Sequence, residues 1–518
     1  MTLARMFAAA VARQPEATAI VDGERRLSYG DWQAEILHLA GGLRTRGLGP
    51  GDHLVAVLAN RMEMATLYWA CQYLGLIFTP FNWRASAREM AYILTDAEAK
   101  AVVYEQRSAE AMVMAAAEAG LAADMLINMD RTGAGSFAAT IGSAPSFEGD
   151  PPRDERATSL MLYTSGTTGR PKGVPRSYAA EQYAALACLA QLHYRHGEIS
   201  LGVMPLFHTM GVRALLMSSF LNGRFVCQPT FDAETAATVI AREGVSALFL
   251  VPTMFHDLVH HPRTDEFDLS SVRNIAYAGM SMTTALIEAC TDKFKLDLFS
   301  NYYGSSEVYS LSVCTDMIGR PGSAGRACIG QTLRIVATDN ERLVSPDEVV
   351  EGGESGEVIA NMASPDAFGG YWKRPDADQK SIRDGWYFTG DLGRFDDEGE
   401  LQLQGRVDDM IISGGENIYA EEVEDVLARS EQVHGVAVIG LPDDRWGERV
   451  TAFIEPASQD ITAAALDAFC LDSGLARFKR PKGYVFVRQI PRSASGKLLR
   501  RHLRTGEYAQ LSDFNNTL

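Results

Sequence analysis

The stretch 159-SLMLYTSGTTGRPKG-173 opens with a short apolar run, residues 159–163, that is typical of a buried strand. In the loop that follows, residues 164–173, three glycines allow tight turns and a close approach to a ligand. Four hydroxyl side chains and Lys172 add donors and positive charge to a nest of backbone N–H groups, which suits phosphate. A Walker loop needs Ser or Thr after its lysine, whereas Gly173 and Val174 follow here. The stretch therefore predicts a strand that ends in a polyphosphate cradle of another kind.

The segments before this loop alternate between strand patterns and helix patterns. Residues 54–58 and 101–104 are apolar runs typical of buried strands, and apolar residues at helical spacing cover 63–74. Ser86 and Glu89 form a capping box that begins another helix. Such alternation predicts a parallel, doubly wound α/β sheet. Ligands gather at the carboxyl ends of the strands in these sheets, so we expect the phosphate loop at that edge.

The bulk composition limits the possible partners. At 518 residues the chain exceeds what one core usually supports, so we expect at least two domains. A net charge of -18, from 48 basic and 66 acidic residues, disfavours nucleic acid or an anionic membrane as a partner. The seven cysteines are scattered without a CxxC pair, and no uncharged run approaches membrane-spanning length. We therefore expect a cytoplasmic protein with reduced thiols and no nucleic-acid or membrane partner.

Further motifs place turn residues beside side chains with binding chemistry. They are PLFHT at 205–209, AGM at 278–280, YYGSSE at 302–307, GWYFTGD at 385–391, GRVDDMIISGGEN at 405–417 and PRSASGK at 491–497. From 322 to 406, short β runs separated by Gly and Asp turns predict a small β-barrel or an antiparallel subdomain. Beyond that point, helix and strand patterns predict a small α+β domain.

Together these motifs resemble those of the adenylate-forming superfamily: acyl-CoA and aryl-CoA synthetases, peptide-synthetase adenylation domains and luciferases. The resemblance covers essentially the whole chain, and in its later part it is most similar to aryl-CoA ligases such as 4-chlorobenzoate:CoA ligase. It implies an α/β fold in which a large N-terminal domain, residues 1–405, combines doubly wound sheets with a small β-barrel. A hinge at 406–410 and a small mobile α+β lid domain, residues 411–518, complete it.

The resemblance implies an ATP site and a Mg²⁺ site. The nucleotide-binding residues that it implies are Thr164, Ser165, Gly166, Thr167, Thr168, Gly169, Lys172, Ala278, Gly279, Tyr303, Gly304, Ser305, Ser306, Asp391 and Arg406. Among them Tyr303 stacks on adenine, Asp391 and Arg406 meet the ribose, and Ser306 replaces the family's threonine with its hydroxyl kept. Glu307 holds Mg²⁺, which can complete its shell with water and substrate phosphate, so one carboxylate suffices.

The resemblance also assigns catalytic, hinge and CoA-binding roles. The catalytic residues are Lys497, His208, Glu307 and Gly415, and Asp408 is the hinge. The CoA-binding residues are Arg84, Gly414, Gly415, Trp446, Arg480 and Lys482. Two half-reactions are implied, in which ATP first converts a carboxylic acid to an acyl-adenylate and the CoA thiol then takes the acyl group. Positioned positive charge assists the first step, because two anions must meet there.

The acid substrate is the least determined part of this interpretation. Matching positions along the acid pocket are His208, Thr209, Met210, Ala278, Tyr302, Tyr309 and Ser310, a modest aromatic wall. They predict a small aromatic or heteroaromatic acid, with a medium-chain or alicyclic acid as the alternative. An amino-acid adenylation domain that loads a carrier protein is a second alternative, disfavoured because His208 and its neighbours include no aspartate for the amine. A scaffold without catalysis is disfavoured by the presence of all the motif residues. We consider a homodimer as its assembly.

Overall fold

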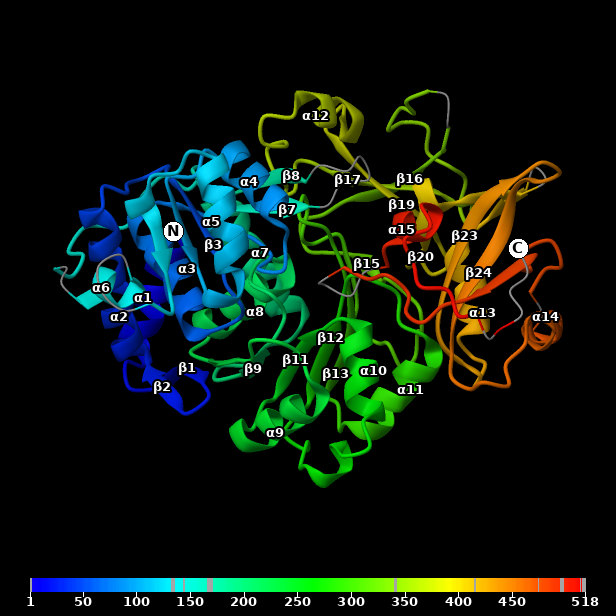
Figure 1. Cartoon of the computed structure of the whole chain (residues 1–518), viewed down its shortest axis with the longest axis horizontal. Helices are drawn as coiled ribbons and strands as arrows, with labels where there is room; N and C mark the ends of the chain where they lie inside the picture. Colours follow the sequence, from blue (N-terminus) through cyan, green and yellow to red (C-terminus); the bar gives the residue numbers. More distant parts are fainter. Residues whose placement is uncertain are drawn as a thin grey trace.

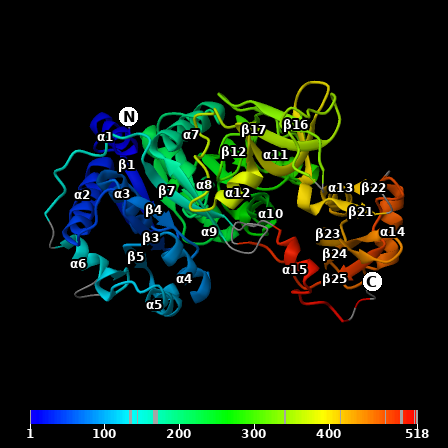
Figure 2. The ribbon, with the colours of Figure 1, turned by 90° about the horizontal axis from the view of Figure 1, so that it is seen from above.

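The computed structural model describes residues 2–131, 136–142, 145–164, 171–339, 342–413, 416–473, 475–493, 498–512 and 514 of the 518-residue chain. Four sheets organise these residues. Figure 1 shows the C-terminal part, in orange and red, at one end of the molecule, and Figure 2 shows the same separation from above. Within the described residues, no helix combines the length and the apolar character needed to span a membrane.

The first large sheet carries the strand that precedes the predicted phosphate loop. Its strands are β3 (His53–Val57), β4 (Ile77–Pro80), β5 (Ala101–Tyr104), β6 (Leu126–Asn128), β7 (Thr158–Thr164) and β8 (Lys172–Ser177). They lie in the order β6-β5-β3-β4-β7-β8. Neighbouring strands are parallel, except that β7 and β8 pair in antiparallel fashion. The antiparallel pairing of these two strands reaches Thr164 and Lys172. The predicted loop therefore joins the ends of a hairpin, unlike the strand-to-helix turn of a Walker loop.

The second large sheet supplies the other strand ends of the site. Its strands are β1 (Thr18–Asp22), β2 (Arg25–Ser28), β9 (Ile199–Gly202), β10 (Arg224–Cys227), β11 (Ala247–Leu250), β12 (Asn274–Tyr277), β13 (Leu298–Tyr303), β14 (Ser312–Cys314) and β15 (Arg326–Ala327). Their order is β15-β14-β13-β12-β11-β9-β10-β1-β2, with a parallel centre from β13 to β1. The edges are antiparallel, and the β1–β2 hairpin turns at Gly23 with a φ of 59°.

Helices cover both of these sheets. They are α1 (Leu3–Arg13), α2 (Tyr29–Thr45), α3 (Met62–Leu74), α4 (Ala87–Asp96), α5 (Ala109–Glu118), α6 (Phe137–Gly142), α7 (Tyr178–Gln191), α8 (Thr209–Phe220), α9 (Ala233–Glu243), α10 (Pro252–His260) and α11 (Thr284–Lys293). One hydrophobic core joins the two sheets and includes the fully buried Trp32 and Trp69. The predicted capping box is present, with Ser86 and Glu89 bonding each other's backbone N–H at the start of α4.

The segment between 322 and 406 forms an antiparallel sheet, one of the two forms that its sequence predicts. Its strands are β16 (Leu333–Val336), β17 (Gly356–Asn361), β18 (Ile382–Arg383), β19 (Trp386–Phe395) and β20 (Leu401–Arg406), with α12 (Pro375–Ser381) beside them. The order is β16-β17-β19-β18, and β20 also pairs with β19. That last pairing sets Asp391 directly opposite Arg406. The register therefore brings together two residues that the sequence assigns to the ribose.

The C-terminal part has its own sheet and its own core. It contains β21 (Ile411–Ser413), β22 (Glu416–Ile418), β23 (Val433–Asp443), β24 (Gly447–Pro456) and β25 (Gly483–Phe486), with α13 (Ala420–Leu427), α14 (Ala463–Asp472) and α15 (Arg500–Arg504). The order is β22-β21-β24-β23, with β25 parallel to β24. A 3₁₀ turn at Val407–Asp409 connects it to β20. Its apolar cluster, centred on Val423, Ile454 and Phe486, confirms the predicted α+β unit.

Candidate active site

Several of the predicted nucleotide residues lie at the carboxyl ends of strands, whereas Lys172 begins β8 and Asp391 lies within β19. Part of the predicted site lies outside the described residues. Ser165, Gly166, Thr167, Thr168, Gly169, Gly414, Gly415 and Lys497 fall there. Thr164 ends β7, Tyr303 ends β13, and Ala278 and Gly279 follow β12. Position 304 requires glycine for a steric reason, because a Cβ there would lie 1.9 Å from the Tyr309 carbonyl oxygen.

A hydrogen-bonded group forms around Asp391. Arg406 Nη1 donates to Asp391 Oδ1 at 2.6 Å, and the Tyr303 hydroxyl donates to Asp391 Oδ2 at 2.5 Å. The Asp391 charge raises the pKa of Arg406, so this guanidinium stays charged. A Cβ at Gly390, whose φ is 72°, would lie 2.8 Å from Arg406 Nη2. The contacts thus hold one carboxylate beside an aromatic ring at the end of β13.

A second group joins Lys172, Glu307 and Tyr371. The Tyr371 hydroxyl donates to Glu307 Oε1 at 2.8 Å, and Lys172 Nζ lies 3.9 Å from the centre of the Tyr371 ring. Burial lowers the pKa of Lys172, and Arg406 lowers it further, whereas Glu307 acts in the opposite direction. These electrostatic interactions connect the group to the one around Asp391. The sequence did not single out Tyr371, whose backbone is positioned by the adjacent Trp372 N–H bonding to Gly173 on β8.

A fully buried ionic network lies behind the Glu307 turn. Glu181 on α7 accepts hydrogen bonds from Arg176 Nε of β8, at 3.0 Å, and from Arg213 of α8. The centre of the Tyr309 ring lies 3.9 Å from the guanidinium carbon of Arg176 and 4.7 Å from that of Arg213. Arg176 Nη1 also donates to the Glu307 carbonyl oxygen at 3.0 Å. This network ties two helices and a strand to the turn that carries Glu307, and sequence spacing gave no signal for it.

The predicted acid-pocket residues come from three elements. His208 caps the start of α8, and Thr209 and Met210 begin that helix. Burial lowers the pKa of His208 to about 4, so its imidazole is neutral at pH 7. Tyr302 is buried, with its hydroxyl bonded to Ser310 Oγ at 2.8 Å and to Gln191 Nε2 at 3.2 Å.

Three of the predicted CoA residues, Arg84, Trp446 and Lys482, take part in contacts between a cation and an indole ring. Lys482 Nζ lies 3.9 Å and the Arg445 guanidinium carbon 4.7 Å from the Trp446 ring centre in the C-terminal part. Arg480 is paired there with Asp467 at 2.7 Å. In the N-terminal part, the guanidinium carbons of Arg84 and Arg107 lie 4.0 Å and 4.8 Å from the centre of the Trp83 ring.

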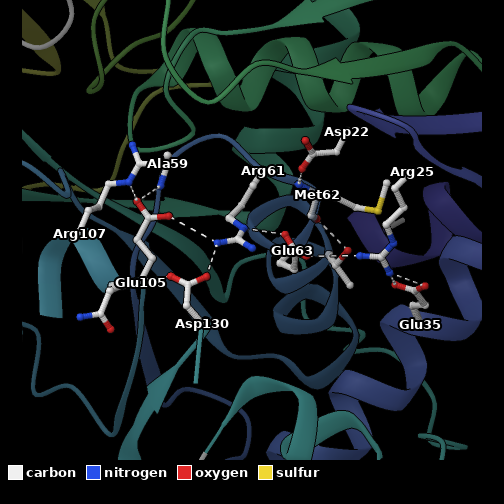
Figure 3. A network of polar contacts seen from close by, with 12 residues as sticks. Asp22, Arg25, Glu35, Ala59, Arg61, Met62, Glu63, Glu105, Arg107 and Asp130 are labelled. Atoms are coloured by element: carbon white, nitrogen blue, oxygen red, sulfur yellow. Dashed lines mark hydrogen bonds and ion pairs between the residues drawn. The ribbon is translucent and has the colours of Figure 1, made fainter. Parts of the chain in front are cut away.

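Arg107 belongs to a polar network beside the ends of β3 and β5, shown in Figure 3. Its Nε lies 2.8 Å from Glu105 Oε1, and Glu105 is also paired with Arg61 at 3.6 Å. Arg61 bonds in turn to Glu63 at 2.7 Å and to Asp130 at 3.0 Å. The ion pair with Glu105 restrains Arg107 beside Trp83, although 45% of the Arg107 side chain is exposed. Of the two arginines beside Trp83, the sequence predicts a role only for Arg84.

The C-terminal part contacts the larger part near the 3₁₀ turn. Ser281 Oγ donates to Glu421 Oε2 at 3.2 Å. Burial raises the pKa of Glu421 to about 7, with a further contribution from Glu424. Arg500 bonds Glu424 at 2.7 Å and Asp409 at 3.4 Å, which links α15 and α13 to the turn itself.

Comparison with known proteins gives a consistent result along the chain. A family profile described as AMP-binding enzyme matches residues 7–372, and one described as AMP-binding enzyme C-terminal domain matches 422–497. Feruloyl-CoA synthase from an Amycolatopsis species is 32% identical over 495 residues, 95% of this chain and 96% of its own. 4-Chlorobenzoate–CoA ligase from an Arthrobacter species is 33% identical over 519 residues, covering 97% and 95% respectively.

Solved structures agree with these relatives. The o-succinylbenzoate CoA synthetase from Bacillus subtilis, in complex with its acyl-adenylate intermediate, is 27% identical with a TM-score of 0.84. The match covers 98% of this chain and 99% of that one. The chain therefore belongs to the AMP-binding enzyme family, within the adenylate-forming superfamily that its motifs resemble. It is an acyl-CoA synthetase, an acid:CoA ligase that uses ATP.

Proposed function

We propose that this enzyme activates a small aromatic or heteroaromatic acid and transfers the acyl group to CoA. In the first half-reaction a carboxylate oxygen of the acid attacks the α-phosphorus of ATP, pyrophosphate leaves, and an acyl-adenylate forms. In the second, the CoA sulfur attacks the adenylate carbonyl and AMP leaves. The observation that best supports the ATP-dependent step is the grouping of two cations and two carboxylates that interact with one another, namely Lys172, Arg406, Glu307 and Asp391.

The nucleotide is proposed to bind across the Asp391 group. Each carboxylate oxygen has two lone pairs, so Asp391 can accept from ribose hydroxyls while it keeps its present donors. The Tyr303 ring, anchored through its hydroxyl, would offer a flat face to adenine. Lys172 would meet the phosphates, and its burial strengthens that attraction because screening by water is reduced.

Mg²⁺ is proposed to bind at Glu307. The carboxylate of Glu307 is buried, and none of the described residues places a Lys, Arg or His nitrogen within 4.0 Å of it. Lys172 acts on this carboxylate only from beyond 4.0 Å, and a buried carboxylate without a cation in direct contact suits an ion with oxygen preference. The ion would supply charge neutralisation for the phosphates when bound. Tyr371 would keep Oε1 oriented while the other oxygen meets the metal ion.

The acid is proposed to bind between α8 and the end of β13. Neutral His208 can donate a hydrogen bond to a carboxylate oxygen and would gate the pocket. The Tyr302 ring lies 6.2 Å from Phe249 in an edge-to-face arrangement, and its hydroxyl is already bonded. A wall of fixed aromatic rings favours a flat acid of modest size over a long alkyl chain.

The remaining assignments concern the lid and CoA. We place the N-terminal adenylation domain at 1–405, a hinge at 406–410 with Asp408 as its pivot, and the lid at 411–518. Lys497 would serve adenylate formation, and Gly414 and Gly415 the thioester step. CoA would meet Arg84 on one domain and Trp446, Arg480 and Lys482 on the other. Arg107 would add a second positive charge to the first contact, because its guanidinium lies beside the same indole.

Two further proposals concern the surroundings of the enzyme. All seven cysteines are free and buried, which agrees with a reducing compartment, and we propose the cytoplasm. We also propose a homodimer, which light scattering on the purified chain would test. A monomer at all concentrations would contradict that assembly without affecting the reaction.

The decisive experiment supplies Mg²⁺, ATP, CoA and a panel of aryl, alicyclic, alkyl and amino acids to the purified enzyme. We expect AMP release and thioester formation to be highest with small aromatic acids. Strong preference for long fatty acids would contradict the pocket assignment. ATP–pyrophosphate exchange with amino acids but not with aryl acids would favour a carrier-loading enzyme. Absence of AMP release with every acid would overturn the proposed reaction.

A further inference from the structure

The hydroxyl of Tyr302, on β13, is held by two buried hydrogen bonds. It donates to Ser310 Oγ at 2.8 Å and accepts from Gln191 Nε2 at 3.2 Å. Gln191 is the last residue of α7, and its side chain is buried. We propose that Gln191 is a positioning residue for the acid substrate, because it holds the Tyr302 ring in the wall of the acid pocket. This role rests on the acid pocket of the proposed function, and it falls to a residue outside the sequence motifs.

The orientation of the Gln191 amide follows from a backbone contact. The Ile329 N–H donates to Gln191 Oε1 at 2.8 Å, and a backbone N–H can only donate, so the amide oxygen faces Ile329. The amide nitrogen then faces Tyr302 and donates to its hydroxyl. The single proton of that hydroxyl is left for Ser310. Gln191 therefore sets the direction of this whole chain of hydrogen bonds.

The Ser310 end of the chain is fixed as well. The Ser310 N–H donates to Asp366 Oδ2 at 2.8 Å, and the Ser364 hydroxyl donates to Asp366 Oδ1 at 2.7 Å. Asp366 is fully buried, so water does not compete for these bonds. Burial raises the pKa of Tyr302 well above its ordinary value, so the phenol keeps the proton that it donates. With that proton engaged, Tyr302 offers an acid its ring and not a hydrogen bond.

The other neighbours of Tyr302 cannot replace the Gln191 amide. The Phe249 ring lies edge-to-face with its ring centre 6.2 Å away, and it contributes packing only. The thiols of Cys188 and Cys328 lie beside the hydroxyl, but burial raises the pKa of both, and a neutral thiol is a weak donor. Without Gln191 the ring is free to shift and the pocket wall can give way to a longer acid. Each methylene that a pocket accepts or excludes changes kcat/KM roughly 10- to 200-fold.

The test compares kcat/KM for benzoate and for hexanoate in the purified full-length enzyme. Gln191→Met keeps the length of the side chain and removes both of its hydrogen bonds. We expect the ratio of benzoate to hexanoate to fall at least about tenfold. The change should come chiefly from a higher KM for benzoate, with its kcat within about threefold of wild type. An equal loss with both acids would indicate a merely structural role and would overturn the proposal.

Gln33→Met is the matched control. It removes a hydrogen bond of the same kind, from Gln33 Nε2 to the Tyr73 hydroxyl at 2.8 Å, between α2 and α3. This variant should keep the wild-type ratio of the two acids. Melting curves check that each variant is folded.

A double-mutant cycle shows whether Gln191 acts through Tyr302. Tyr302→Phe keeps the ring and removes both bonds of the hydroxyl, so the ratio should fall in this variant too, even if Gln191→Met does not fold. The double variant should match Tyr302→Phe within about twofold, and a further tenfold loss would overturn the connection. An active wild type with unchanged ratios in both single variants would overturn the role of Gln191 alone. A wild type that releases no AMP with any acid would overturn the proposed reaction, and this role with it.

Discussion

The Tyr371 hydroxyl donates a 2.8 Å hydrogen bond to Oε1 of Glu307. Burial raises the pKa of Tyr371, and the negative charge of Glu307 raises it further, so the phenol keeps the proton that it donates. The same ring lies under the Lys172 ammonium. One aromatic side chain therefore contacts both the proposed metal ligand and the proposed phosphate ligand, and it fixes their separation.

Tyr371→Phe should slow adenylate formation by about tenfold or more, because a hydrogen bond to a charged group is worth roughly 1.5–3 kcal/mol. The ring remains, so Lys172 keeps its aromatic contact and the fold should be unchanged. The measurement is ATP–pyrophosphate exchange at several Mg²⁺ concentrations, where we expect a raised requirement for the ion. Tyr183→Phe is the control, since its hydroxyl bonds only a surface carbonyl, that of Ile329. Equal rates in the two variants would contradict the role of Tyr371.

Glu181→Gln should destabilise the larger domain by about 3–5 kcal/mol, because it leaves two buried guanidinium groups without their counter-charge. Urea unfolding would show the loss as a lower midpoint with an unchanged slope. Glu234→Gln removes the partner of Arg263 in an exposed pair, and there we expect a change of about 1 kcal/mol or less. A small effect of Glu181→Gln would contradict this role, because it would mean that water or rearranged side chains compensate the buried charges of Arg176 and Arg213.

The elements and motifs could be predicted from sequence because their signals are local. The strand at 101–104 and the capping box at Ser86 depend on neighbours within a few residues. The ribose role of Asp391 was implied by the motif at 385–391 and stays a prediction. Periodicity and turn residues carry that information directly. The loop at 164–173 was predicted to bind phosphate from its residue types, and this role stays a prediction because residues 165–170 lie outside the described part of the chain.

Contacts between distant residues could not be predicted in this way. Tyr371 meets Glu307 across 64 positions, and Arg213 meets Glu181 across 32, so no spacing rule connects them. Isolated Tyr and Arg residues are common, and only the tertiary packing gives these ones a partner: α7 against α8 for Arg213, and the turn after β13 against the segment before α12 for Tyr371. The roles of Lys497 and Asp408 stay predictions for the same reason, because they depend on how two domains meet.

The contact between Glu421 and the N-terminal domain should depend on pH. Its pKa is raised from the ordinary 4.5 to about 7, chiefly by burial, so the protonated form is favoured in this arrangement. The stabilising contribution is then fully present below pH 4.5 and is lost as the pH rises through 7. By linkage its ceiling is about 3 kcal/mol, and partial exposure reduces it.

Glu421→Gln should therefore unfold at a higher urea concentration than the wild type at pH 8, and at nearly the same concentration at pH 5. The measurement is urea unfolding of the full chain at half-unit pH intervals. Glu431→Gln, which alters an exposed residue in the turn after α13, should follow the wild-type profile. A constant difference between Glu421→Gln and the wild type across the range would show that the carboxyl does not titrate there.

Asp408→Pro should separate the two half-reactions if the lid turns about this residue. Asp408 lies in the 3₁₀ turn Val407–Asp409. Arg500 and Arg504 form ion pairs with Asp409 and so hold this turn in place. Proline fixes φ near −65° and would restrict rotation of the chain at the pivot. We expect adenylate formation from ATP to remain within about threefold of wild type, and thioester formation to fall at least about a hundredfold.

Single-turnover assays with the acid and ATP, then with added CoA, measure the two steps separately. Asp397→Pro, in an exposed turn of the antiparallel sheet, controls for the effect of a proline as such. Equal loss of both steps in Asp408→Pro would contradict a hinge, because a merely misfolded turn would impair adenylate formation as strongly as transfer to CoA.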